Sequence, residues 1–345
     1  MKKMKIIAFL AFALITACQN EPWDFPDYDY TTVYFPYQSP VRTLILGEDI
    51  IDNSLDNAHK FKVMAALGGV YENTKEIVID VRVDNQLCDS LKFSSAAGND
   101  VFALPSDYYI LPEKQQIVIP SGSVMGGMEV QLTDAFFNDP RSISHAFVLP
   151  LVMTSVSNAD SILSGASTLE NPDRRVTGDW TTVPKDYTLY AVKFINPWHG
   201  NYLRRGVDVV KGKQGNTTLD TTIVYRAKYV EWDEVISIST VSLNEASMQL
   251  NTRNKGSLDN ISFEVMIQFD PNGENCTLSH PESASYTLTG SGKFVNDGDE
   301  WGNIKRDVLH LNYEIDFGSV RHTFTDTIVM RDRGIAFETF TPVVF

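Results

Sequence analysis

The sequence has little cysteine and no apolar run long enough to cross a membrane as a helix. Its 345 residues include three cysteines, Cys18, Cys88 and Cys276. Their wide spacing and the lack of a CxxC pair argue against a disulfide framework and against a cysteine-based metal site. We therefore interpret Cys88 and Cys276 as small buried hydrophobic residues.

Basic residues are also scarce. The 29 lysines and arginines are outnumbered by 44 aspartates and glutamates, which gives a net charge of -15. Nucleic-acid binding depends on clusters of Lys and Arg that contact phosphates, so we expect no nucleic-acid partner. The same acidity disfavours adhesion to anionic lipid by charge, so contact with a membrane is expected through a lipid anchor only.

Short motifs that identify common enzymes are absent. None of the six histidines forms an HxH or HExxH pattern, and no GxSxG occurs. His310 and His322 fall on opposite faces of one predicted hairpin, so they cannot share a metal. No local pattern identifies the two carboxylates, ~5–9.5 Å apart, that a glycosidase needs. We expect no enzyme, no metal and no cofactor, with a glycoside hydrolase as the weakest alternative.

The first 17 residues have the organisation of a secretory signal peptide. Three lysines near the start precede an apolar run over residues 6–15, and Thr16-Ala17 precede Cys18. This order of basic, apolar and small segments is typical of export. A cysteine directly after the small pair is typical of bacterial lipoproteins, in which the cleaved chain carries lipid on that thiol. We predict lipidation of Cys18; the alternative is an ordinary signal peptide with a chance cysteine.

Residues 18–30 are predicted to form a lipidated tether. The segment contains two prolines and several acids and no apolar period, which favours an extended chain. Acids shortly after the lipidated cysteine resemble the signal that sends Bacteroidetes lipoproteins to the cell surface. We therefore expect a protein anchored in the outer membrane and facing the cell exterior.

Alternation of apolar and polar residues predicts strands over residues 31–156. The stretches 61–67, 77–83 and 128–132 alternate with a period of two, and turn-forming residues follow several of them. Such alternation places one set of side chains on a core face. Many short strands with regular turns and almost no helical period predict an N-terminal Ig-like β-sandwich.

The rest of the chain is predicted to form a second β domain. Residues 157–186 show no period and are interpreted as a linker. Strand character returns over 187–345 and is strongest in 261–269, which ends at the turn formers of 270–273. The acidic stretch 296–300 is interpreted as a turn rather than a calcium loop. An antiparallel β-sandwich and a small barrel both fit this half, so the whole chain is predicted to be all-β.

Aromatic residues in polar surroundings are the clearest candidates for ligand binding. A tryptophan ring can stack on the apolar face of a sugar while neighbouring polar groups bond its hydroxyls. The alternative is that each ring closes the end of a sandwich, because tryptophan is mostly buried. The candidate carbohydrate-binding residues are Trp180, Trp198, Tyr202, Trp232 and Trp301.

Several stretches resemble a known group of proteins. Residues 104–109 (Leu-Pro-Ser-Asp-Tyr-Tyr), 117–122 (Ile-Val-Ile-Pro-Ser-Gly) and 147–151 (Phe-Val-Leu-Pro-Leu) resemble the N-terminal domain of uncharacterised Bacteroidetes surface lipoproteins. Residues 186–206 resemble the start of their second domain. These lipoproteins are similar to proteins encoded beside outer-membrane glycan importers in polysaccharide-utilisation loci.

The resemblance implies surface capture of a glycan rather than its hydrolysis. Its expected partners are an oligo- or polysaccharide and outer-membrane importer proteins, and it supplies no binding residues. Our hypothesis is a surface-anchored glycan-binding lipoprotein that assists polysaccharide capture. The alternative is a non-catalytic structural or assembly lipoprotein with a protein partner. Exposure of Trp198 and Trp301 favours the first, and burial of both favours the second.

Overall fold

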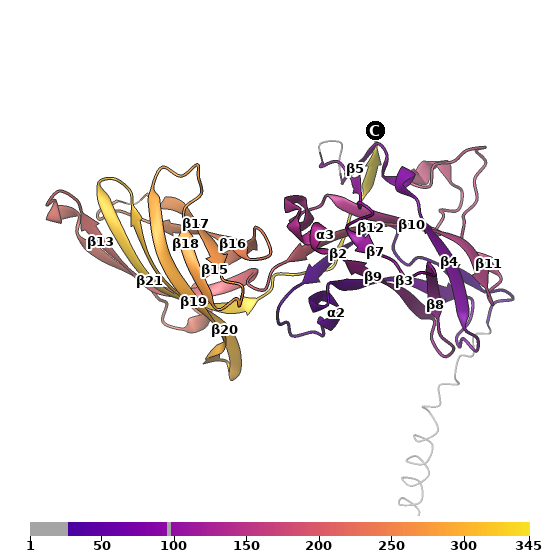
Figure 1. Cartoon of the computed structure of the whole chain (residues 1–345), viewed down its shortest axis with the longest axis horizontal. Helices are drawn as coiled ribbons and strands as arrows, with labels where there is room; N and C mark the ends of the chain where they lie inside the picture. The colour runs from indigo at the N-terminus through magenta and orange to yellow at the C-terminus, as the bar shows by residue number, and fades with distance from the viewer. Residues whose placement is uncertain (1–26, 95–97, 258) are drawn as a thin grey trace, which may run out of the picture.

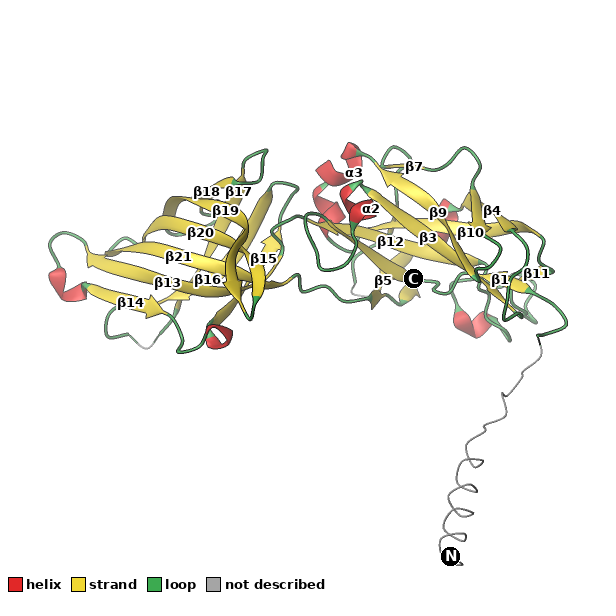
Figure 2. Ribbon diagram, turned by 90° about the horizontal axis from the view of Figure 1, so that it is seen from below, coloured by secondary structure: helices red, strands yellow, loops and turns green. Residues whose placement is uncertain are grey.

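The computed structural model describes residues 27–94, 98–257 and 259–345, and it is almost entirely β-structure in two domains (Figures 1 and 2). The predicted signal peptide, Cys18 and the first part of the tether lie outside these residues. No helix among the described residues is long and apolar enough to span a membrane. The all-β prediction is confirmed.

The first domain is built on one large curled sheet. Its strands are ordered β11-β1-β3-β9-β8-β4-β10-β12-β2-β22, with β6 beside β10 and β7 beside β9. The strands are β1 (Thr32–Tyr34), β2 (Pro40–Ile45), β3 (Lys60–Gly68), β4 (Ile77–Val83), β6 (Phe102–Ala103), β7 (Tyr109–Ile110), β8 (Gln116–Ile119), β9 (Met125–Leu132), β10 (Phe147–Ser157), β11 (Ser161–Ile162), β12 (Tyr187–Ile195) and β22 (Glu338–Thr339).

The two halves of this sheet enclose a common core. Phe61 of β3, Val130 of β9 and Phe194 of β12 belong to the same buried cluster. The short helix α3 (Asp134–Asn138) adds Phe136 and Phe137 to this core, and the short helix α2 (Ser54–Asn57) precedes β3. The other helical turns are the 3-10 helices Asn85–Cys88, Pro140–Ile143, Thr177–Asp179, Thr217–Leu219 and Val230–Trp232.

Strand β12 belongs to the first domain, which corrects the boundary predicted at residue 187. It pairs with β10 on one side and runs parallel to β2 on the other. Leu189 and Ala191 pack against a second cluster that contains Phe93 and Phe340, whereas Phe194 faces the main core. A strand that is buried on both faces lies in the middle of a sheet, so the crossing to the second domain begins only after Ile195.

Residues 157–186 are an excursion of the first domain and not the predicted linker. Strand β11 pairs with β1, and an isolated bridge joins Ala166 to Thr182. Arg174 forms an ion pair with the buried Asp186 at 3.1 Å. The segment continues from the edge strand β11 and is held by hydrogen bonds within it, so it needs no alternation of apolar and polar residues.

The second domain is a closed antiparallel barrel, which decides between the two architectures predicted for this half. Strand β13 pairs with both β15 and β21, so eight strands form a ring and β14 lies beside the second half of β13. The strands are β13 (Gly200–Gly212), β14 (Thr221–Tyr225), β15 (Glu234–Thr240), β16 (Glu245–Thr252), β17 (Ile261–Phe269), β18 (Asn275–Ser279), β19 (Thr287–Trp301), β20 (Ile304–Asp316) and β21 (Val320–Asp332).

Side chains fill the interior of the barrel. Alternate residues point inward, as the burial patterns of β17 and β20 show. An eight-stranded ring is just wide enough to be filled in this way. Met248, Phe263 and Leu311 are among the buried residues of this core. His322 is buried inside and His310 is exposed outside, which confirms that the two histidines point apart.

The chain crosses between the domains twice. After the barrel it returns to the first domain, where β22 pairs with β2, and β23 (Pro342–Val344) forms a two-stranded sheet with β5 (Leu91–Phe93). In Figure 1 this yellow segment ends beside β5. Residues 335–345 are therefore part of the first domain, in contrast to the predicted range of the second.

The first crossing is fixed to both domains. The side-chain amide of Asn196 donates to the carbonyls of Ser242 and Glu245 at 3.0 and 2.9 Å. On the other side, a Cβ at Gly47 would lie 2.7 Å from Cβ of Pro197, closer than real Cβ contacts allow. The backbone at Gly47 also has a φ of 87°, so both its space and its conformation require glycine.

His199 at this crossing is predicted to make the protein less stable in mild acid. Burial, together with the positive charges of Arg333 and Lys193, lowers its pKa to about 4. The unfolded chain takes up a proton near pH 6.5 and the folded chain does not, so stability falls between pH 6.5 and about 4. We expect this loss to be roughly 2 kcal/mol, because the ring is only partly buried.

The matched variant is His199→Asn, whose amide oxygen can still accept from the Thr240 N–H that His199 Nδ1 contacts at 3.2 Å. Urea unfolding at pH 7.0, 5.5 and 4.0 measures the two stabilities. The difference in free energy of unfolding between the unaltered protein and His199→Asn should shift in favour of the variant as the pH falls. Identical pH slopes for the two proteins would refute the assignment.

Candidate functional site

The tip of the β19–β20 hairpin carries the first site residue, Trp301. The hairpin closes through Gly302 and Asn303, whose φ angles are 63° and 59°. Positive φ at both central residues is the geometry of a type I′ turn, which suits Asn and Gly. The predicted turn at 296–300 is wrong, because these residues belong to β19 and interrupt its ladder as a bulge between Val295 and Asp299. Such a bulge bends a hairpin.

The bent tip lies over the outer face of the barrel. Leu203 of β13 and Val329 of β21 point outward but are only 3% and 7% exposed. Between the tip and these strands is a groove of about 520 Å³. Its walls are formed by the tip residues Asp299, Glu300 and Trp301, by outward residues of β13 and β21, and by the segment 224–233. We call this cavity the tryptophan groove.

The ring of Trp301 is held by an arginine. The guanidinium of Arg306 lies 4.1 Å from the ring centroid and donates to the carbonyl of Arg331 at 2.9 Å. This cation–π contact and hydrogen bond fix the tip against the end of β21. The indole Nε1 of Trp301 is buried and has no partner within the described part of the chain. Because this atom is closed to solvent, the part of Trp301 that borders the groove is its ring and not its N–H.

Both signs of charge line the tryptophan groove. Arg205 forms an ion pair with the buried Asp233, which also accepts from the Ala227 N–H at 2.8 Å. Arg226 lies on the same wall, and the opposite wall carries Asp299 and Glu300. A balanced set of donors and acceptors suits a neutral, hydroxyl-rich ligand better than a strongly charged one.

Exposed aromatic residues lie next to the groove. Trp232 is 66% exposed and packs edge-on against Tyr229, with ring centroids 4.8 Å apart. Both residues lie in the segment that supplies Val230 and Asp233 to the groove wall. The predicted candidate Trp232, in the connection between β14 and β15, and Trp301, in the β19–β20 hairpin, thus border one region of the barrel surface.

Burial corrects the prediction at two positions. Trp198 is 3% exposed and stacks in parallel on Phe269, with ring centroids 3.6 Å apart. Trp198 also borders a cavity of about 440 Å³ beside Asn272 and Gly273. Tyr202 is fully buried in the barrel, and its hydroxyl donates to the Trp198 carbonyl at 2.7 Å. Both side chains close one end of the barrel core and offer no face to a sugar.

Trp180 lies in the first domain and does not join the tryptophan groove. Its indole N–H donates to the carbonyl of Asp173 at 2.8 Å, within the excursion 157–186. The half-buried ring stabilises that excursion. Across the described ranges, no group of three or more His, Cys, Asp or Glu side chains is arranged to hold a metal ion.

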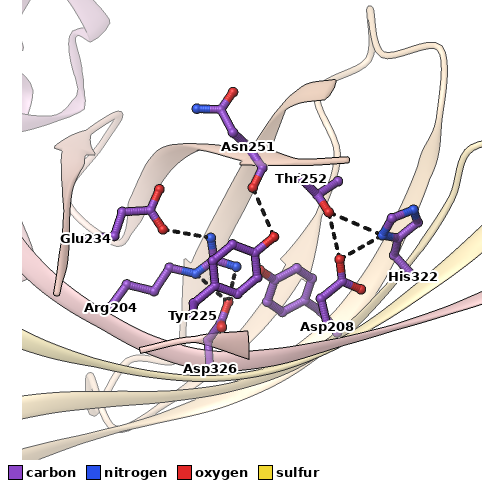
Figure 3. A network of polar contacts seen from close by, with 9 residues as sticks. Arg204, Asp208, Tyr225, Glu234, Asn251, Thr252, His322 and Asp326 are labelled. Atoms are coloured by element: carbon purple, nitrogen blue, oxygen red, sulfur yellow. Dashed lines mark hydrogen bonds and ion pairs between the residues drawn. The ribbon is translucent and has the colours of Figure 1, made fainter. Parts of the chain in front are cut away.

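A polar network inside the barrel adjoins the tryptophan groove through Tyr225, and Figure 3 shows its side chains. Arg204 is buried and donates to Asp326 at 3.0 and 3.2 Å and to Glu234 at 3.3 Å. Its guanidinium also lies 3.9 Å from the ring centroid of Tyr225, a residue that lines the groove. The network therefore fixes β13, β14, β15 and β21, the strands that support the groove.

A second cluster of three side chains, also inside the barrel, continues the network. Asp208 accepts from Thr252 at 2.7 Å and contacts Nδ1 of His322 at 2.8 Å, and all three side chains are buried. Sequence reasoning missed this cluster. The available signal was the parity of β13, where Arg204 and Asp208 share the inward face with Tyr202.

Comparison with known proteins shows similarity to two family models and to solved structures from Bacteroides. The family described as Domain of unknown function (DUF5627) matches residues 197–334, and a second family, described as an N-terminal domain, matches residues 28–160. A crystal structure of a Bacteroides ovatus protein of unknown function is 39% identical, with a TM-score of 0.84. It covers 92% of this chain and 100% of its own. The chain belongs to the family of this Bacteroides protein.

The match to DUF5627 follows the barrel, since it begins at the crossing and ends where the chain returns, whereas the N-terminal match ends before β11 and β12. An auxiliary nutrient binding protein from Bacteroides thetaiotaomicron is 12% identical with a TM-score of 0.38, and it covers 84% of this chain and 90% of its own. A likeness this distant carries no argument for the family's function. No protein of curated function matches the chain.

Proposed function

We propose that this family member is a lipid-anchored, non-catalytic glycan-binding protein of the outer surface, and that its site is the tryptophan groove. The observation that carries the proposal is the Trp301 ring, held by Arg306 in a groove of about 520 Å³ with charged hydrogen-bonding groups on both walls. Aromatic faces with a few placed polar groups are typical of small-ligand sites.

The sequence supports the location of this activity. The leader and Cys18 predict an exported lipoprotein, and the net charge of -15 leaves the lipid as the means of attachment. A site on a tethered domain can function with modest affinity, because anchoring raises the local concentration of binding sites. We propose that captured polysaccharide is passed to an importer of the same membrane.

Trp301→Ala is expected to weaken glycan binding at least ten-fold, since it removes the stacking face. Affinity electrophoresis through gels that contain individual polysaccharides identifies a retarding glycan first and then compares variants. Trp232→Ala should weaken binding by about three-fold, because this exposed ring lies beside the groove.

Trp180→Ala is the matched control, because Trp180 is a half-buried tryptophan of the other domain. Its retardation should equal that of the unaltered protein. Failure of every polysaccharide to retard the unaltered protein would overturn the proposal. Release of reducing sugar from a retarding glycan would instead support a glycoside hydrolase.

Cys18→Ser is expected to abolish lipidation and shift the protein from the membrane fraction to the soluble fraction. Mass spectrometry of the amino terminus identifies the processed, acylated residue. Cys88→Ala is the control, because burial raises the pKa of the Cys88 thiol to about 12 and keeps it unreactive. Recovery of the unaltered protein with its leader still attached would contradict the anchoring proposal.

The second candidate function is binding of a protein partner by the barrel. Val224, Val235 and Ile304 are exposed near the groove, and contiguous apolar surface is typical of protein interfaces. Polysaccharide electrophoresis separates the two candidates, since a purely protein-binding barrel would show no retardation on any glycan.

A further inference from the structure

A second cavity lies in the first domain and shares no residue with the tryptophan groove. It has a volume of about 740 Å³ and lies between β2 and the returning segment 332–337, against Met64 of β3 and Met125 of β9. Apolar side chains dominate its lining. We call it the return groove.

The return groove is bordered by large apolar side chains that are open to solvent. Ile50 is fully exposed, Ile51 is 61% exposed and Phe337 is 69% exposed. The ring of Phe337 lies against that of Tyr37, with centroids 5.0 Å apart. Exposed apolar residues occur singly on most proteins, and a contiguous set around a cavity marks an interaction surface. Flexible methionines on its floor can adapt to a partner's side chains.

The charge around the return groove is acidic. Ile50 and Ile51 lie within Glu48-Asp49-Ile50-Ile51-Asp52, whereas Asp332 across the cavity pairs with Arg331 at 3.5 Å. The two arginines of the lining are already engaged, since Arg42 pairs with Asp56 and Arg333 donates to backbone carbonyls. None of Glu48, Asp49 and Asp52 forms an ion pair with another described residue. The carbonyls do not neutralise Arg333, but its single positive charge is outnumbered by these three acids, so the net charge at the rim is negative.

We propose that the return groove docks a segment of a partner protein whose apolar residues are flanked by lysine or arginine. Apolar side chains of the segment would fill the cavity, and its basic residues would face the acidic rim. A second copy of this chain fits less well, because it would bring the same acids together. A sugar also fits less well, because isoleucine and methionine offer no partners to hydroxyl groups. This inference does not depend on glycan binding, since it uses a different domain and different residues.

Two synthetic peptides test the proposal on the purified protein by fluorescence anisotropy. Both have the same extended core of leucine and phenylalanine, and one has lysine flanks where the other has glutamate flanks. The lysine peptide is expected to bind at least ten-fold more tightly, and the difference should shrink at high salt. Ile50→Ser should weaken its binding at least five-fold without affecting folding, because Ile50 is fully exposed. Ile110→Ser, at an exposed isoleucine of β7 that does not line the return groove, is the control and should have no effect.

Other results would overturn the proposal. Binding of neither peptide, equal binding of both, or no effect of Ile50→Ser would each exclude a basic, apolar partner at this groove. A dimer in sedimentation that Ile50→Ser abolishes would assign the groove to a second copy. Glycan retardation that is lost in Phe337→Ala and retained in Trp301→Ala would assign it to a sugar.

Discussion

Arg204→Met is expected to lower the free energy of unfolding of the barrel by about 3–5 kcal/mol. Arg204 is fully buried, and its loss leaves Asp326, which is 1% exposed, without its cationic partner. Burial already raises the pKa of Asp326, although Arg204 and a 2.7 Å hydrogen bond from Tyr313 favour its ionised form. An isolated buried carboxylate is strongly unfavourable, so the variant should also gain stability as the pH falls and Asp326 takes up a proton.

Two further variants separate this effect from simple loss of packing. The double variant Arg204→Met with Asp326→Asn removes the stranded charge and keeps an acceptor for Tyr313, so it should recover at least half of the lost stability. Arg321→Met is the control. Arg321 lies on β21, the strand of Asp326, and is half exposed and 3.2 Å from Glu314. This variant should change stability by less than about 0.5 kcal/mol. Urea unfolding followed by tryptophan fluorescence measures all three, and equal losses in the single and double variants would refute the charge argument.

The tryptophan groove should be lost with this network before the barrel unfolds completely. Tyr225 contacts Arg204 on its inner side and lines the groove on the other. The hydroxyl of Tyr225 also contacts the carbonyl of Asn251 at 3.3 Å, where β14 and β16 do not pair. The network thus substitutes for a missing ladder beneath the site, which gives buried polar groups a structural role on this side of the barrel.

The sequence predicted the strands well because alternation is a local property. The run 261–269 became β17 with the predicted inward residues, and Asp270 to Gly273 forms the predicted turn. Which strands become neighbours depends on pairings far apart in the chain. Strand β12 therefore looked like the start of a second domain, although its partners β10 and β2 lie in the first.

The candidate site was predictable only in part, for the same reason. Turn-forming neighbours made Trp198 look exposed, yet the crossing between domains turns its ring onto Phe269 in the barrel core. Trp301 lies at the groove because a bulge bends its hairpin over β13 and β21, and no local pattern shows where that bend points. Exposure of an aromatic residue depends on packing between elements, which the period of a strand does not contain.

Arg333→Ala is expected to loosen the two domains from each other. Its guanidinium donates to four backbone carbonyls, those of Leu46 and Glu48 in the first domain and those of Asn196 and His199 in the crossing, at distances of 2.8–3.0 Å. Burial lowers the pKa of Arg333, which shows that its environment disfavours the positive charge. The hydrogen bonds to the carbonyls offset this cost. The alanine variant leaves these carbonyls without their donor, and we expect a loss of about 2–4 kcal/mol.

Arg333→Lys should fail to restore the junction, because an ammonium group has three donors at one point and cannot reach carbonyls on two sides. Arg331→Ala is the matched control, since Arg331 is half exposed and pairs only with Asp332 at 3.5 Å. Small-angle scattering should show a wider distribution of interdomain distances for both Arg333 variants than for the unaltered protein. The distribution for Arg331→Ala should be unchanged. Limited proteolysis should cut the Arg333 variants near 333–337 first. A junction that stays rigid without Arg333 would show that the return strands β22 and β23 are sufficient to hold the domains together.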